Sequence, residues 1–92
     1  MSKLDRIKEL LDQNETFPLE FTFKFIGKNS EKFLKSLELF QNMYPRLKKQ
    51  GEKRSANDQH TSMTFVISAE TSNEIIRIYE DISRIDDIIV VL

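Results

Sequence analysis

Side chains with catalytic and metal-binding potential gather at one point of the chain. Asp58, His60 and Ser62 alternate there. A serine nucleophile needs an ordered histidine base, and a metal centre needs several nitrogen, sulfur or carboxylate ligands. Because the chain has one histidine and no cysteine, neither arrangement is complete. We predict a solvated polar turn here, with no catalytic residue, no metal and no cofactor, in a protein that is not an enzyme.

Lysine and hydroxyl side chains form a second cluster with binding chemistry. Lys24 follows Thr22 in one predicted strand, and Ser62 and Thr64 alternate in another. An ammonium group among hydroxyls can hold a small anionic ligand or a carboxylate of a partner protein. The alternative is a solvated sheet face whose lysine extends into water. Both interpretations stay open at this point.

A glycine and a lysine precede the start of a predicted helix. Gly27, Lys28 and Asn29 lead to Ser30, which can cap the helix. Free backbone N–H groups at such a helix start can bind a carboxylate or a phosphate. The alternative is an ordinary capped turn, because most helix starts bind only water.

A run of basic residues lies in the middle of the chain. Within residues 46–54 it comprises Arg46, Lys48, Lys49, Lys53 and Arg54, opposed by Glu52 alone. RNA is one partner that such a patch could bind. The alternative is protection of a sheet edge, for which lysines are commonly used. An RNA-binding sheet of this kind would also need exposed stacking aromatics, and the pattern places Phe65 in the core.

Hydrophobic periodicity predicts the elements that position these residues. Apolar residues recur at helical spacing in residues 2–13, in residues 31–44 and from Thr71 to about Arg84. Period-2 alternation or β-branched runs predict strands at 17–27, 62–68 and 88–92, and residues 46–54 read as a weak edge strand. The order is a leading helix followed by β-α-β-β-α-β. This order predicts an α+β, ferredoxin-like fold, with a four-stranded antiparallel sheet, both long helices on one face, and the first and third strands central.

Length, charge and hydropathy limit what kind of protein this is. A chain of 92 residues with a net charge of −1 has room for one core and carries no global field that attracts nucleic acid. We expect residues 1–16 to form the leading helix and linker and residues 17–92 the domain. No apolar run reaches the length of a membrane span, so we expect a cytoplasmic protein.

One long motif resembles a known family. The run from Phe17 to Gly27, FPLEFTFKFIG, resembles the opening motif of the YbeD-like family of small bacterial proteins, and Ser55, Ala69 and Tyr79 fall at that family's spacing. The hairpin departs from the family, with Asp58 and His60 where a glycine and a tyrosine are common. The resemblance implies a fold similar to ACT-type regulatory domains in a family without an assigned role.

We therefore expect a non-enzymatic, ACT-like regulatory or protein-interaction domain, for which a small anionic ligand is one candidate besides a protein partner. The alternative is an RNA- or ribosome-associated module. The final strand adds an expectation of self-association, because Ile88, Val90 and Leu92 belong to an edge strand without charge or proline. Either the leading helix covers this edge, or a second copy pairs with it as a dimer.

Overall fold

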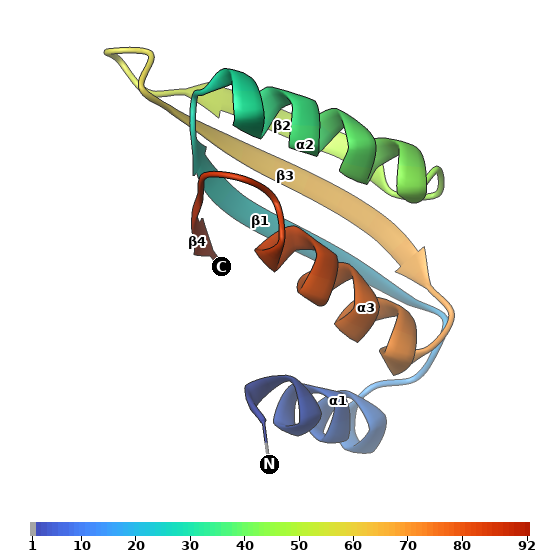
Figure 1. Cartoon of the computed structure of the whole chain (residues 1–92). Helices are drawn as coiled ribbons and strands as arrows, with labels where there is room; N and C mark the ends of the chain where they lie inside the picture. The colour runs from blue at the N-terminus through green and yellow to red at the C-terminus, as the bar shows by residue number, and fades with distance from the viewer. Residues whose placement is uncertain (1) are drawn as a thin grey trace.

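The computed structural model of the chain describes residues 2–92 and confirms the predicted order of elements (Figure 1). They are α1 (Lys3–Asn14), β1 (Leu19–Lys28), α2 (Glu31–Met43), β2 (Lys48–Arg54), β3 (His60–Ala69), α3 (Ser72–Ser83) and β4 (Ile88–Val91). The strands form one antiparallel sheet in the order β2-β3-β1-β4, and α2 and α3 cover one face. The fold is α+β and ferredoxin-like, with β1 and β3 central as predicted.

Hydroxyl caps begin all three helices. Ser2 Oγ accepts a hydrogen bond from the N–H of Asp5 at 3.1 Å, and Ser30 Oγ accepts one from Phe33 at the same distance. At α3, Thr71 Oγ1 accepts from the N–H of Glu74 at 3.2 Å. These bonds satisfy N–H groups that have no partner inside the helix. The helices therefore start where the sequence predicts.

Aromatic side chains fill the space between the sheet and the helices. Phe23 and Phe25 of β1 are fully buried, and the rings of Phe25 and Phe65 stack with centroids 5.8 Å apart. From the helix side, Leu37, Phe40 and Ile75 complete the same core. The predicted faces of β1 are confirmed. Phe21 and Tyr79 are only partly buried, at the margin of this core.

Several strand boundaries differ from the prediction. β1 begins at Leu19 instead of residue 17, β3 runs from His60 to Ala69 instead of from 62 to 68, and β4 ends at Val91. β1 continues past Gly27 to Lys28, because both residues pair with β3, at Thr61 and His60. β2 begins at Lys48 instead of residue 46 and contains a register shift between Lys49 and Gly51. Such a bulge inserts one unpaired residue and changes which side chains share a face.

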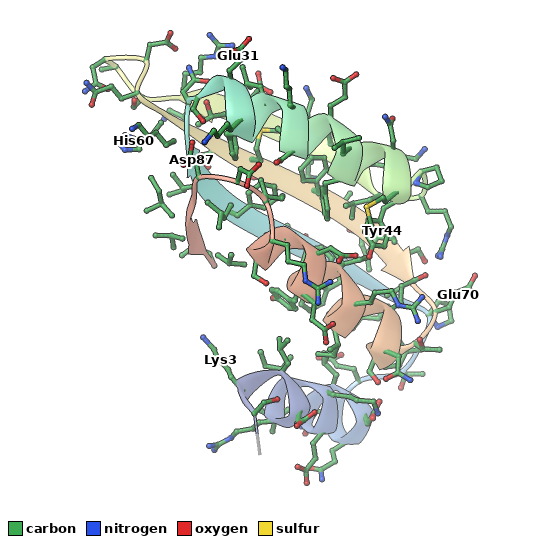
Figure 2. The ribbon with its side chains drawn as sticks, in the orientation of Figure 1. Lys3, Glu31, Tyr44, His60, Glu70 and Asp87 are labelled. Carbon is green, nitrogen blue, oxygen red and sulfur yellow. The ribbon has the colours of Figure 1, made fainter. Side chains whose placement is uncertain are left out.

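The turn before β4 is attached to α2. Ser30 Oγ donates a hydrogen bond of 2.5 Å to Asp87, and Ser36 Oγ donates one of 2.9 Å to Asp86. Figure 2 shows Asp87 beside the start of α2, which carries the labelled Glu31. Asp87 has a φ of 60°, in the left-handed region that aspartate tolerates better than most residues. The turn thereby brings β4 alongside β1.

The leading helix packs against α3 and not across the outer edge of β4. None of its residues is buried, and its apolar Leu4, Ile7 and Leu11 are partly exposed. α1 therefore lies at the side of the helix layer, and α3 covers only part of its apolar face. Within residues 2–92, no helix is long and apolar enough to cross a membrane.

Candidate functional site

The predicted lysine and hydroxyl residues lie together on the sheet face that carries no helix. In register, Lys53 of β2, Ser62 of β3 and Ile26 of β1 form one row across the sheet. The adjacent row consists of Gly51, Thr64 and Lys24. Thr22 lies one pleat further along β1 on the same face. We call Thr22, Lys24, Lys53, Ser62 and Thr64 the open-face site.

Two lysines flank the hydroxyls of this site from opposite sides. Lys24 and Lys53 lie on strands two apart, so their backbones are separated by roughly 10 Å, with Ser62 and Thr64 between them. Both lysines are exposed, and neither has an ion-pair partner among residues 2–92. Gly51 adds no side chain above Thr64. The arrangement leaves room for an anion that both ammonium groups can reach.

The surrounding face is basic. By strand register it also carries Lys28 and Lys48, whereas Glu20 is its single acidic residue among the paired positions. A hollow of about 180 Å³ opens beside the site, toward the β2–β3 turn. It is lined by Ile26, Lys53, Arg54, Ser55, His60 and Ser62. Lys53 and Ser62 therefore belong both to the open-face site and to the wall of a depression.

The predicted anion-binding loop at Gly27, Lys28 and Asn29 is used differently in the structure. The N–H groups of Lys28 and Asn29 donate to the carbonyl oxygens of Asp87 and Gln59, at 2.9 and 2.8 Å. The N–H of Ser30 donates to Lys28 at 2.8 Å. Gly27 lies inside β1, and a Cβ on it would overlap the ring of Phe33. This backbone is therefore structural, and only the Lys28 side chain adds to the basic face.

The predicted polar turn around His60 borders a second hollow. It measures about 390 Å³ and is lined by Lys28, Asn29, Asp58, Gln59 and His60. Asp58 accepts from Arg54 at 3.4 Å, whereas Asn29 Nδ2 donates to the carbonyl of Asp58 at 3.1 Å. Within residues 2–92, no three histidine or carboxylate side chains converge as metal ligands. His60 is exposed and contributes to the edge of the basic face.

The structure divides the predicted basic patch. Arg46 pairs with Glu74 at 2.6 Å and also donates to the carbonyl oxygen of Ser68. Lys49 pairs with Glu52 at 3.6 Å, and Arg54 pairs with Asp58 at 3.4 Å. Of the five residues, Lys48 and Lys53 remain without ion pairs within the described chain, and both lie on the open face. The run does not form one continuous surface.

The predicted oligomer edge is also divided. Ile88 packs against the core, whereas Val90 lies opposite Ile26 on the open face with 39% exposure. Leu92 is 61% exposed. Self-association through this edge stays a prediction, which light scattering of the purified protein would test.

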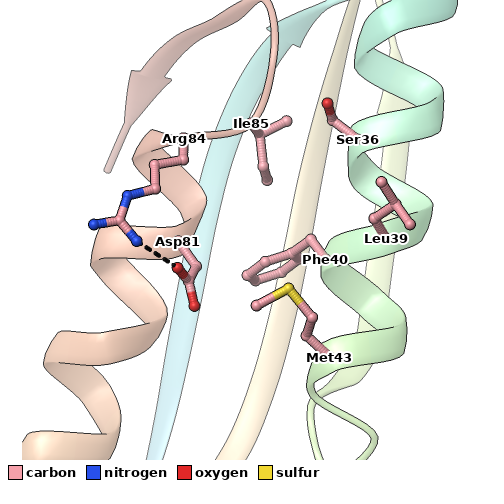
Figure 3. A pocket seen from close by; sticks show the side chains of 7 residues that line it. All are labelled: Ser36, Leu39, Phe40, Met43, Asp81, Arg84 and Ile85. Carbon is pink, nitrogen blue, oxygen red and sulfur yellow. Dashed lines mark hydrogen bonds and ion pairs between the residues drawn. The ribbon is translucent and has the colours of Figure 1, made fainter.

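A cleft lies between α2 and α3, and no sequence pattern predicts it (Figure 3). It measures about 290 Å³ and is lined by Ser36, Leu39, Phe40, Met43, Asp81, Arg84 and Ile85. Its carboxylate is already bonded: Asp81 accepts from the Tyr44 hydroxyl and from Arg84. The pKa of Tyr44 is raised, first by burial and then by this carboxylate. The cleft therefore presents mainly apolar surface.

Comparisons with known proteins support the fold more than any activity. Residues 12–92 match the family model described as "Protein of unknown function (DUF493)". The chain is similar to the solution structure of protein HP0495 from H. pylori, with 18% sequence identity and a TM-score of 0.64, over 89% of this chain and 92% of that chain. At that identity, the likeness shows the fold alone. No curated protein matches the chain.

Proposed function

Because the chain belongs to the DUF493 family, the YbeD-like proteins of unknown function, we propose a function from its own geometry: a non-enzymatic, ACT-like regulatory domain that binds a small anionic ligand on its open sheet face. The ligand class is a compact molecule with carboxylate or phosphate groups. One observation carries the proposal. Lys24 and Lys53, both without ion pairs in the described chain, flank Ser62 and Thr64 in adjacent rows.

The chemistry of these side chains suits an anion. Hydrogen bonds from ammonium groups to carboxylate or phosphate oxygens are stronger than those between neutral groups. The hydroxyls of Ser62 and Thr64 can donate further bonds without adding a negative charge. A ligand that binds the folded protein alone also stabilises it. Ligand binding to this face would therefore raise the free energy of unfolding of the protein.

The RNA alternative has weaker support. Sequence-specific binding of single-stranded RNA relies on bases that stack on aromatic side chains. The phenylalanines of β1 and β3 all point toward the helices, and the apolar residues of the open face are Ile26, Val66 and Val90. Within residues 2–92, the paired positions of this face include no aromatic ring except the imidazole of His60 at its end. We therefore favour the small anion.

Titration of the ¹⁵N-labelled protein with citrate, pyrophosphate and a ten-nucleotide uridine RNA tests the proposal. We expect saturable shifts of the amide signals of Lys24, Ser62 and Thr64 with citrate or pyrophosphate. Lys24→Met and Lys53→Met should each weaken this binding about tenfold, because each removes a charge-assisted bond. Lys35→Met is the matched control, since Lys35 is an exposed lysine of α2 without an ion pair in the described chain.

The outcomes separate the candidate functions. If Lys35→Met weakens anion binding as much as Lys24→Met does, the anion is held by unspecific charge attraction, which contradicts the proposed site. Binding of the RNA at lower concentration than either small anion, with a steep dependence on salt, would favour the RNA alternative. Unchanged amide signals with all three probes would leave the open face as a solvated surface and overturn the proposal.

A further inference from the structure

Half of β1 has an open edge, although the strand is central in the sheet order. β1 pairs with β3 along its whole length, from Leu19 to Lys28. On its other side, β4 pairs only with Phe25, Ile26 and Gly27, and one further bond joins the N–H of Leu92 to the carbonyl oxygen of Lys24 at 2.8 Å. The first half of β1 therefore lies at an edge that β4 does not reach.

The direction of the backbone groups at this edge follows from that last bond. In an antiparallel pair, one residue directs both its N–H and its C=O to the same neighbouring strand, and the next residue directs them to the opposite side. Since Lys24 bonds toward β4, Thr22 and Glu20 face the same way. No hydrogen bond from residues 2–92 reaches their backbone groups on this side. The edge offers two donors and two acceptors at strand spacing.

An apolar groove lies beside this edge, between α1 and α3. It measures about 300 Å³ and is lined by Lys3, Leu4 and Ile7 of α1, by Tyr79 and Ser83 of α3, and by the end of β4 at Val91 and Leu92. The ring of Tyr79 packs edge-on against Phe21 and Phe23 of β1, with centroids 6.0 and 5.0 Å apart. Figure 2 shows Lys3 extending from the start of α1 toward β4. The groove and the open backbone edge are therefore adjacent.

We infer that this edge and groove bind an extended peptide of a partner protein as an added strand. The peptide continues the register of β4 and runs antiparallel to β1. Its residues opposite Phe23, Phe21 and Leu19 face the groove and are apolar. Its residues opposite Thr22 and Glu20 face the open side of the sheet and are polar, with a basic side chain favoured beside Glu20, which is exposed and has no ion pair in the described chain.

The position of α1 favours a single strand over a second copy of the chain. Added strands are spaced by 4.7–4.9 Å, whereas packed helices need 8–10 Å. α1 packs against α3 and, in Figure 1, lies beyond it on the side of the sheet that carries β1 and β4. A two-fold copy paired at this edge would bring its own helix layer into α1. One extended peptide meets no such obstacle.

Blocked five-residue peptides test the inference through their backbone. The parent peptide is Val-Thr-Val-Lys-Val, with threonine opposite Thr22 and lysine opposite Glu20. One derivative is N-methylated at the threonine and lysine amides, whose N–H groups face β1. The control derivative is N-methylated at the central valine, whose N–H faces away. We expect the first to bind at least about tenfold more weakly than the parent, because two hydrogen bonds are removed, and the control to bind as the parent does.

Hydrogen exchange of the protein and two variants of α1 complete the test. The amides of Glu20 and Thr22 should exchange faster than those of Phe21 and Phe23 in the free protein, and the peptide should slow them. Ile7→Glu should weaken peptide binding, whereas Leu10→Glu should not, since Leu10 is half exposed and does not line the groove.

Three results would overturn the inference. If both methylated peptides bind with equal affinity, the peptide is held by its apolar side chains alone and not by backbone hydrogen bonds. Unchanged exchange of Glu20 and Thr22 at saturating peptide would place the contact elsewhere. Slow exchange of these two amides in the peptide-free protein, together with a doubled mass, would show that a second copy occupies the edge.

Discussion

The hydroxyl of Tyr44 donates a hydrogen bond to the carboxylate of Asp81 and so joins the end of α2 to α3. The other oxygen of Asp81 accepts from Arg84 at 3.1 Å. Tyr44→Phe removes one bond but leaves this carboxylate paired. We expect a loss of about 1 kcal/mol in the free energy of unfolding, the usual size for one hydrogen bond. Urea unfolding measures it, and an unchanged midpoint would mean that the bond contributes nothing.

The same contact predicts a dependence on alkaline pH. Burial, followed by the hydrogen bond to Asp81 and the negative charge of that carboxylate, raises the pKa of Tyr44 in the folded chain. In the unfolded chain, tyrosine ionises with a pKa of about 10. Above that pH the unfolded state loses its proton first, so the contribution of Tyr44 is fully present below about pH 10 and is lost as the pH rises toward the folded pKa.

The measurement compares wild type with Tyr44→Phe in urea at about pH 8 and at about pH 11. The stability advantage of the wild type should shrink at the higher pH. Burial also raises the pKa of Tyr79, but Tyr79 is present in both chains, so its effect cancels in the difference. If the wild type keeps the same stability advantage over Tyr44→Phe at both pH values, the pKa of Tyr44 is not raised as we describe.

Removal of a central core ring should come close to unfolding the protein. Phe23 is 0% exposed and packs edge-on against Tyr79. Phe23→Ala should cost about 3–5 kcal/mol, a large part of the stability of a domain this small. Thr22→Ala, one residue away on the exposed face, should stay within about 0.5 kcal/mol. A loss below about 1 kcal/mol for Phe23→Ala would contradict the packing of this core.

Gly27 and Phe33 predict a coupled pair of substitutions. A Cβ on Gly27 would lie 2.1 Å from Cε1 of Phe33, a ring that is itself 0% exposed. Gly27→Ala should therefore cost about 1–3 kcal/mol through overpacking. With Phe33→Leu in the background, the same substitution should cost less by about 1 kcal/mol or more. Equal costs in both backgrounds would place the strain elsewhere.

Most of the fold could be predicted because its elements have strong local patterns. Alternating phenylalanines identify β1, and hydroxyl residues mark all three helix starts. β2 was found for another reason: it has almost no apolar side chain, but its lysines follow the pattern of a protected edge. The docking of α1 was harder, because its apolar stripe fits several surfaces equally well and tertiary packing alone selects α3.

The candidate site was predicted in part. Alternation alone places Thr22, Lys24, Ser62 and Thr64 on one face, since the side-chain period of a strand is fixed. Lys53 could not be assigned to that face, because β2 has no alternation of buried and exposed side chains that would show which face each residue occupies. The open edge beside Thr22 was missed for a different reason: the order of strands says nothing about how far β4 reaches along β1.

The bulge in β2 has a consequence for how relatives of this chain should be compared. Lys48 and Lys53 are an odd number of positions apart, so in a regular strand they would face opposite sides. They share a face because one extra residue shifts the phase of the strand between Lys49 and Gly51. An insertion or deletion at this point moves side chains elsewhere in the strand to the opposite face of the sheet, although those residues themselves are unchanged. Lysines in other members of the family must therefore be compared by the face of the sheet that each one occupies. Two sequences with identical charges can present different surfaces.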